Sequence, residues 1–333
     1  MSRGCELCEK GAKMVLFITG ECTRSCFYCP ISEERRGRDV IFANERPVRR
    51  DEDVLIEARL MDALGTGITG GEPLLKLERV LHYSRLLKKE FSEEHHIHLY
   101  TSLAPSEGVL RKLRKAGIDE LRFHPPVELW DRIKETEYPE SMKIAKKIGF
   151  EVGFEIPALK EVPQLIEVLR DVGGFLNLNE LEFSETNAEE LMRRGFVLKS
   201  DEECGAEGSE EIAKMIMEDA RDIPVRFCPS SFKDGVQLRM RLKRIAKNVA
   251  RRFDEITEDG TLVYGVIEGE IDLGELGIPE GMWERRDGRI ETAWWILEEI
   301  AEELEEVTCY IEERYPTYDG IVVEREYVKR RED

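Results

Sequence analysis

Strand-like and helix-like segments alternate along roughly the first 200 residues, and this alternation restricts the fold more than any other feature. Strands are expected at 14–19, 65–69, 96–102, 120–124, 151–157 and 175–181. Helices are expected near 51–64, 76–92, 106–116, 128–148, 161–172 and 187–195. The alternation is typical of an α/β protein whose parallel sheet is wrapped by helices. The six β/α units found are fewer than the eight of a full (β/α)8 barrel.

Polar and apolar residues alternate within these strands, so each kind should face one side of the sheet. The apolar set should meet the helices, which leaves the polar set to line an interior lumen. Active sites of barrels gather at the carboxyl ends of the strands. Four polar residues are expected there, as candidates for ligand contact: Ser102, His124, Glu155 and Asn179.

Three cysteines directly follow the first strand, at positions 22, 26 and 29. Thiolates spaced C-x3-C-x2-C are ligands that suit an iron–sulfur cluster. A closed structural zinc site takes four protein ligands, whereas three leave one coordination position open for chemistry. A plain zinc knuckle is the alternative interpretation.

The motif Cys22, Cys26, Cys29, with Tyr28 before the last cysteine, resembles that of the radical S-adenosylmethionine (radical SAM) superfamily. The stretch 69–73, Thr-Gly-Gly-Glu-Pro, is similar to the GGEP motif of the same family. The resemblance implies that the three cysteines bind a 4Fe–4S cluster that must be protected from oxygen, and that Tyr28 lies beside the adenine of SAM. It also implies that Thr69, Gly70, Gly71 and Glu72 form the edge that holds the methionine part. The implied fold is a partial (β/α)6 TIM-type barrel.

Five further cysteines remain, and in a long cytosolic chain cysteines favour metal binding over disulfides. Cys5 and Cys8 form a C-x2-C pair, which Cys228, with or without Cys204, could complete as a zinc or auxiliary iron–sulfur site. The alternative is that these are free thiols. Cys309 is expected to pack on an amphipathic helix.

The 333 residues carry a net charge of −20, with 36% charged residues of both signs, which indicates a thermophile. The negative charge disfavours a nonspecific nucleic-acid binder. However, the stretch 233–252 holds eight Lys and Arg residues against one Asp, a local charge of +7, so RNA is not excluded. No apolar run reaches the ~20 residues of a membrane helix, and the N-terminus lacks a signal-peptide pattern, so a cytoplasmic protein is expected.

The expected organisation has four parts: a C-x2-C segment at 1–13, the radical SAM partial barrel at 14–232, a basic amphipathic helix at 233–253 and a small α+β domain at 254–333. Within the last part, Asp-Gly pairs at 259–260 and 287–288 predict hairpin turns. A long helix is expected at 291–314 from its apolar periodicity, followed by a strand at 320–328.

Over nearly its full length the chain resembles an archaeal group of radical SAM proteins described as related to pyruvate formate-lyase activating enzymes. The resemblance implies an enzyme that cleaves SAM reductively and abstracts hydrogen from an unknown protein or small-molecule substrate, with ferredoxin or flavodoxin as one-electron donor. Among the lumen residues, we expect His124 and Glu155 to act in catalysis, and Ser102 and Asn179 to contact SAM. An RNA-modifying radical SAM enzyme and a non-catalytic zinc or iron–sulfur protein are the alternatives.

Overall fold

The computed structural model describes residues 1–200 and 203–330. The chain divides into two compact units, which are described separately: Met1–Arg59 with Ala63–Gln237, and Leu60–Asp62 with Leu238–Asp333. None of the helices in the described part of the chain is long and apolar enough to cross a membrane.

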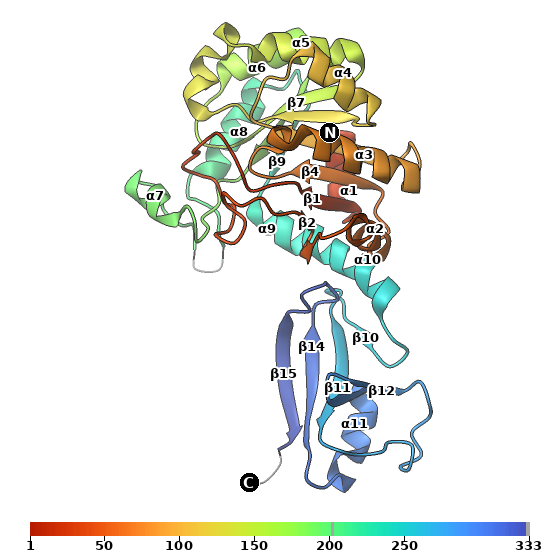
Figure 1. Cartoon of the computed structure of the whole chain (residues 1–333). Helices are drawn as coiled ribbons and strands as arrows, with labels where there is room; N and C mark the ends of the chain where they lie inside the picture. The colour runs from red at the N-terminus through yellow and green to blue at the C-terminus, as the bar shows by residue number, and fades with distance from the viewer. Residues whose placement is uncertain (201–202, 331–333) are drawn as a thin grey trace. The chain divides into compact units, whose positions relative to one another are not determined.

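The first unit, coloured from red to turquoise in Figure 1, is built on a nine-stranded sheet. The strand order is β3-β2-β1-β4-β5-β6-β7-β8-β9. The strands β1 and β4 to β9 run parallel, and β2 and β3 form an antiparallel hairpin at the β1 edge. Their bounds are β1 Lys13–Phe17, β2 Phe42–Ala43, β3 Arg46–Pro47, β4 Gly65–Thr69, β5 His96–Thr101, β6 Glu120–Phe123, β7 Glu151–Pro157, β8 Phe175–Asn179 and β9 Val225–Cys228. All six strands expected from the alternation are present, and β9 is an additional one.

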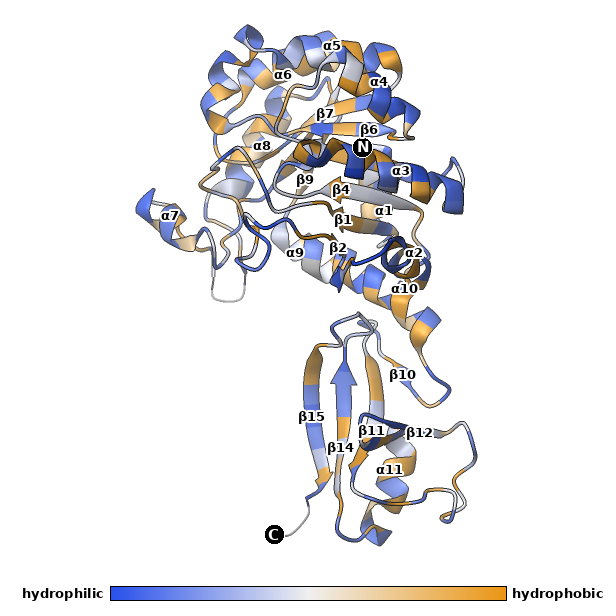
Figure 2. Cartoon of the chain, viewed as in Figure 1, coloured by the Kyte–Doolittle hydropathy of each residue, from blue (hydrophilic) through white to orange (hydrophobic). Residues whose placement is uncertain are grey.

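Helices precede, connect and follow the parallel strands. Their bounds are α1 Arg3–Glu9, α2 Asp51–Leu60, α3 Leu77–Phe91, α4 Glu107–Lys115, α5 Tyr138–Ile148, α6 Pro163–Val172, α7 Ala188–Arg193, α8 Ser209–Asp219 and α9 Ser230–Phe232, with short 3-10 turns at Pro73–Lys76 and Val127–Glu135. The helix expected at 128–148 is therefore divided in two, because Pro139 occupies the first turn of α5 and favours a helix start there. Figure 2 shows both apolar and polar residues along α4 and α5, as expected for helices with one buried face.

The two faces of the sheet differ as the period-two pattern predicts. The apolar residues Leu99, Phe123 and Leu176 are fully buried. On the other face, Arg122, Glu155 and Asn177 are also buried, and Glu155 accepts hydrogen bonds from the other two. Helix α1 lies against β1, β4 and β5, and the backbone N–H of its Gly4 donates to Glu120 on β6 (3.0 Å).

The first unit ends within a π-helical turn, Lys233–Leu238, and the second unit continues the chain with α10 Arg239–Val249. The second unit contains an antiparallel sheet with the order β12-β13-β11-β14-β15, to which β10 adds by pairing with β11. The remaining bounds are β10 Glu255–Ile256, β11 Leu262–Glu268, β12 Trp283–Arg286, β13 Arg289–Thr292, α11 Trp294–Ile300, a 3-10 turn Ala301–Glu303, β14 Thr308–Arg314 and β15 Val322–Lys329. The two Asp-Gly pairs lie in hairpin turns, as predicted.

The prediction of a long helix at 291–314 is wrong. Its residues are divided among β13, α11, the 3-10 turn and β14. Glutamates at 298, 299, 302, 303, 305 and 306 repeat at helical spacings of three and four, where like charges repel and weaken a helix. The β-branched and aromatic residues of 308–311 favour a strand, and β14 pairs with β11 over seven residues. Cys309 is consequently buried on a strand rather than on a helix.

Candidate active site

The three cysteines of the C-x3-C-x2-C motif lie on the long loop that follows β1. All three line one cavity of about 500 Å³, and none forms a disulfide. Cys22 is exposed, whereas Cys26 and Cys29 are half-buried. The ends of β4, β5 and β6 complete the wall, through Thr69, Gly70, Gly71, Tyr100, Thr101, Ser102 and His124. The topology thus brings two sequence motifs, about 40 residues apart, to one cavity.

The glycines after β4 hold the base of the cysteine loop. The N–H of Gly71 donates to the carbonyl of Thr19 (2.7 Å), and the N–H of Glu72 donates to that of Glu21 (2.8 Å). A Cβ at Gly71 would clash with the carbonyls of Glu21 and Gly20, and one at Gly70 would lie 2.5 Å from the carbonyl of Thr19. Only glycine permits this backbone approach.

Glu72 does not line the cavity, although the resemblance implied that it contacts the methionine part of SAM. Its side chain is fully buried, and one oxygen accepts from the N–H and hydroxyl of Ser102 (2.6 and 2.7 Å). The other oxygen accepts from the Thr101 hydroxyl (2.9 Å) and the Leu74 N–H (3.0 Å). The carboxylate therefore joins the end of β4 to the end of β5, and Ser102 lines the cavity with its hydroxyl already donated.

His124 lines the cavity, but both of its ring nitrogens have partners. Nδ1 lies 2.7 Å from the carbonyl oxygen of Glu155, which can only accept, so Nδ1 carries the proton. Burial lowers the pKa of His124, so the ring is neutral and Nε2 accepts from the Tyr28 hydroxyl (3.0 Å). Burial also raises the pKa of Tyr28, which keeps this donor protonated. His124 is thus arranged to orient Tyr28 rather than to exchange a proton.

Glu155 lies at the centre of the polar face of the sheet. It accepts from Arg122 (2.7 Å), Tyr100 (3.0 Å), Asn177 (3.1 Å) and Asn179 (3.1 Å). Burial by itself would raise the pKa of Glu155, but Arg122 and the neutral donors lower it below its usual value. The group is a fixed carboxylate with four donors, and it does not offer a free base.

Comparison with known proteins decides the family. A family model described as the radical SAM superfamily matches residues 16–172, which contain both motifs. A protein of Methanocaldococcus jannaschii is 42% identical over 347 aligned positions, which cover 98% of this chain and 92% of the relative. The chain belongs to the radical SAM superfamily. It is accordingly an enzyme, which excludes the non-catalytic alternative.

The provisional name of this relative is glycyl-radical enzyme activating enzyme. A second family model, described as a domain of unknown function (DUF8061), matches residues 260–328 of this radical SAM protein. Among solved structures, methylornithine synthase aligns with 14% identity and a TM-score of 0.44, over 64% of this chain and 63% of that one. A member of the enolase superfamily from a Polaromonas species aligns with 16% identity and a TM-score of 0.32, over 65% of this chain and 55% of that one.

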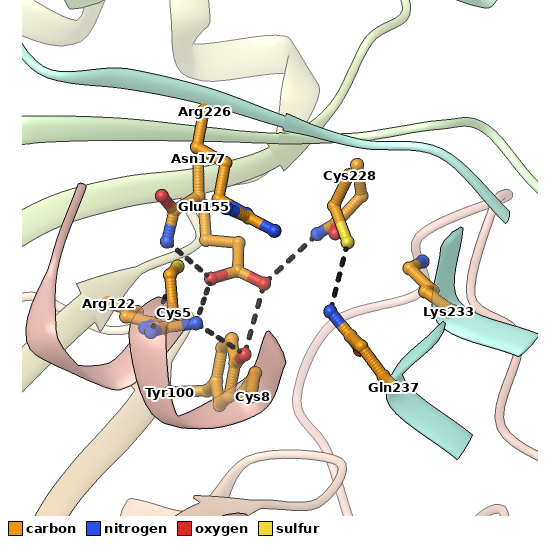
Figure 3. Close-up of a pocket in the computed structure, with 11 residues that line it drawn as sticks. Cys5, Cys8, Tyr100, Arg122, Glu155, Asn177, Arg226, Cys228, Lys233 and Gln237 are labelled. Carbon is orange, nitrogen blue, oxygen red and sulfur yellow. Dashed lines mark hydrogen bonds and ion pairs between the residues drawn. The ribbon is translucent and has the colours of Figure 1, made fainter. Parts of the chain in front are cut away.

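This radical SAM protein has a second cavity, of about 250 Å³ (Figure 3). Tyr100 is a lining residue of both cavities. Cys5, Cys8 and Cys228 line this second cavity. Asn179, which was expected to contact SAM, also lines the second cavity and does not line the first. Burial raises the pKa of Cys8 to about 11 and also raises that of Cys228. Cys204 does not line either cavity.

A segment between β8 and β9 covers the cysteine loop, and sequence reasoning missed its contribution. Asn187 donates to the carbonyl of Tyr28 (3.1 Å), and the Thr186 hydroxyl donates to that of Cys29 (3.3 Å). The ring of Phe196 stacks on Phe27 at 6.2 Å between centroids. Asn187 is the N-cap residue of α7, but its side chain makes no cap hydrogen bond to that helix and donates to the carbonyls of Tyr28 and Glu182.

Proposed function

We propose that this radical SAM enzyme binds a 4Fe–4S cluster through Cys22, Cys26 and Cys29, and binds SAM in the 500 Å³ cavity. When bound, the two cofactors supply an electron and a scissile carbon–sulfur bond, which yield methionine and a 5′-deoxyadenosyl radical able to abstract hydrogen from a substrate. The observation that carries the proposal is that three free thiols line this cavity, with no fourth cysteine among the described residues of its wall. Three thiolates leave one iron open to a further ligand.

The chain's own residues support this assignment. Gly70 and Gly71 present main chain without side chains to the cavity wall and fix the cysteine loop to the end of β4. Tyr28 is held by His124 and Asn187, so its ring has a fixed position beside the thiols. Glu72 orders Ser102, which lines the same cavity. These contacts position ligands and exclude water, as expected where the cofactors provide the chemistry.

The fold that we infer for the first unit is a partial barrel, open between β3 and β9, with the polar face of β5 to β8 turned inward. This inference rests on the linear order of the nine strands and on the buried polar network. The carboxyl ends of parallel strands meet at one edge, where barrel active sites form.

A protein substrate, namely a glycyl-radical enzyme, is favoured by the name of the M. jannaschii relative. The reaction would remove one hydrogen atom from a glycine of that protein. A reduced ferredoxin or flavodoxin would supply the electron for each cleavage of SAM.

The test is anaerobic reconstitution with iron and sulfide, followed by an assay for 5′-deoxyadenosine under reducing conditions. Wild-type protein should form it, Cys26→Ala should not, and Cys204→Ala should behave as wild type because Cys204 lies outside the cavity wall. Failure of the wild type to bind iron and cleave SAM would refute the proposal. For the substrate, a candidate glycyl-radical enzyme of the source organism is added, and a glycyl radical is sought by EPR. SAM cleavage without that radical contradicts the substrate assignment alone.

A further inference from the structure

The thiols of Cys5, Cys8 and Cys228 line the same cavity, although they lie near opposite ends of the first unit in the sequence. Cys5 and Cys8 lie on α1, and Cys228 ends β9, about 220 residues later. The three line the 250 Å³ cavity together, and none of them forms a disulfide (Figure 3). The radical SAM motif uses other cysteines, so this second set has no role in the function proposed above.

Helix α1 is fixed where it presents Cys5 to the cavity. Glu120 accepts from the Gly4 N–H (3.0 Å) and from the Ser2 hydroxyl (3.1 Å). A Cβ at Gly4 would clash with Arg122 and would lie 2.7 Å from Nδ1 of His98. Leu7, on the same helix, is 1% exposed. The C-x2-C segment is therefore part of the polar interior of the sheet rather than a loose terminus.

Two of the three sulfurs already accept hydrogen bonds from nitrogen donors. Arg122 donates to Sγ of Cys5 and Gln237 donates to Sγ of Cys228, each at 3.5 Å. Arg122 is itself fixed by Glu120 (2.6 Å) and Glu155 (2.7 Å). Hydrogen bonds to ligand sulfurs are a means by which proteins orient metal ligands and tune clusters.

We propose that Cys5, Cys8 and Cys228 bind a second iron–sulfur cluster in this cavity. The three thiols lose their protons to solvent on ligation, and the iron and sulfide come from the cluster supply. Three thiolates again leave one iron open, and the amides of Asn177, Asn179 and Gln237 line the remaining space.

The site fits a cluster better than a single zinc ion for three reasons. A structural zinc ion takes four ligands in a tight tetrahedron, whereas three thiols and no histidine line this cavity. A single ion needs its ligand atoms close together. Within the described residues, His96, Glu120 and Glu151 have ligand atoms within 4.8 Å of one another, but the three thiols of this cavity do not form such a group. The cavity also has the volume of about eight water molecules at ~30 Å³ each, more than one ion needs.

The experiment measures iron, acid-labile sulfide and zinc per chain after anaerobic reconstitution of the full-length protein. Wild type should bind ~8 irons, and the variant with Cys22, Cys26 and Cys29 all changed to Ala should keep ~4. Cys5→Ala/Cys8→Ala should lose about half of the wild-type iron, while Cys309→Ala, a buried cysteine of the second unit, should lose none. Circular dichroism of the iron-free proteins shows whether each variant folds.

A second measurement needs no substitution in α1. It starts from the triple variant, in which Cys22, Cys26 and Cys29 are changed to Ala. Reduced with dithionite, it should give the EPR spectrum of a 4Fe–4S cluster, and adding Cys228→Ala should abolish that spectrum. An iron-free triple variant, or zinc in place of iron, would overturn the second site and leave the first intact. A triple variant with as much iron as wild type would instead refute the cluster at Cys22, Cys26 and Cys29.

Discussion

The substitution Glu72→Gln separates the structural role of Glu72 from a direct role in holding a cofactor. The carboxylate accepts four hydrogen bonds, two at each oxygen. Glutamine has nearly the same shape but replaces one oxygen by an NH2 group. In either orientation of the amide, the NH2 group replaces an oxygen that accepts two hydrogen bonds. In one orientation it faces the backbone N–H of Ser102, and in the other it faces that of Leu74.

Each hydrogen bond to a buried charged group contributes ~1.5–3 kcal/mol, so the loss of two should lower the free energy of unfolding by ~3–6 kcal/mol. Against a total stability of ~5–15 kcal/mol, this is a large effect. Urea unfolding of the iron-free protein measures it directly. The exposed Glu52, which pairs with Arg59, provides the control, since Glu52→Gln should change stability by less than ~1 kcal/mol.

Iron content gives the second readout. Glu72 does not line the cavity, so folded Glu72→Gln protein should still bind iron at the wild-type level after reconstitution. A variant as stable as wild type that has lost SAM cleavage would refute the structural role and restore the direct contact that the family resemblance implied.

Three further perturbations test other parts of the site. Gly71→Ala places a Cβ against the carbonyls of Glu21 and Gly20, so it should lower the free energy of unfolding by ~1–3 kcal/mol and reduce iron retention. The control is Gly108→Ala, on α4 with open space around it, which should raise the free energy of unfolding by up to ~1 kcal/mol. Equal effects of the two variants in urea unfolding would contradict the packing argument. Arg122→Met leaves Glu120 and Glu155 buried without their cation, so it should cost ~3–5 kcal/mol at pH 7. Because the pKa of Glu155 should then rise, this cost should shrink on acidification, and a cost that does not vary with pH would show that Arg122 acts through packing alone. Burial lowers the pKa of His95 from 6.5 to about 4, so its contribution to stability is present above pH 6.5 and is lost as the pH falls towards 4. This pKa shift corresponds to ~3 kcal/mol, so His95→Gln should reduce the pH dependence of the free energy of unfolding by about that amount. The control His82→Gln changes an exposed histidine and should leave the pH dependence as in wild type. Identical pH profiles for His95→Gln and wild type would refute the role of His95.

Some features of this protein follow from the sequence because they depend on local spacing. Six of the seven parallel strands were predictable, since alternation of period two is a property of each strand by itself. The two motifs predicted the family, because few residue patterns combine three closely spaced thiols with a glycine pair after the next strand. The polar face of the sheet was also predictable, through residues such as Arg122 and Glu155.

Other features depend on partners distant in the sequence, and only the tertiary structure decided them. The residues of 291–314 have helical periodicity, but pairing of β14 with β11 overrides it. Glu72 has the spacing of a cofactor ligand, yet hydrogen bonds from Thr101 and Ser102, about 30 residues later, hold its carboxylate away from the cavity. Asn187 supports Tyr28 across 159 residues, and no local pattern encodes that contact. The sequence determined which groups the protein carries, and the fold decided which of them remain free for ligands, because a buried polar group bonds to whatever donors the fold brings within reach.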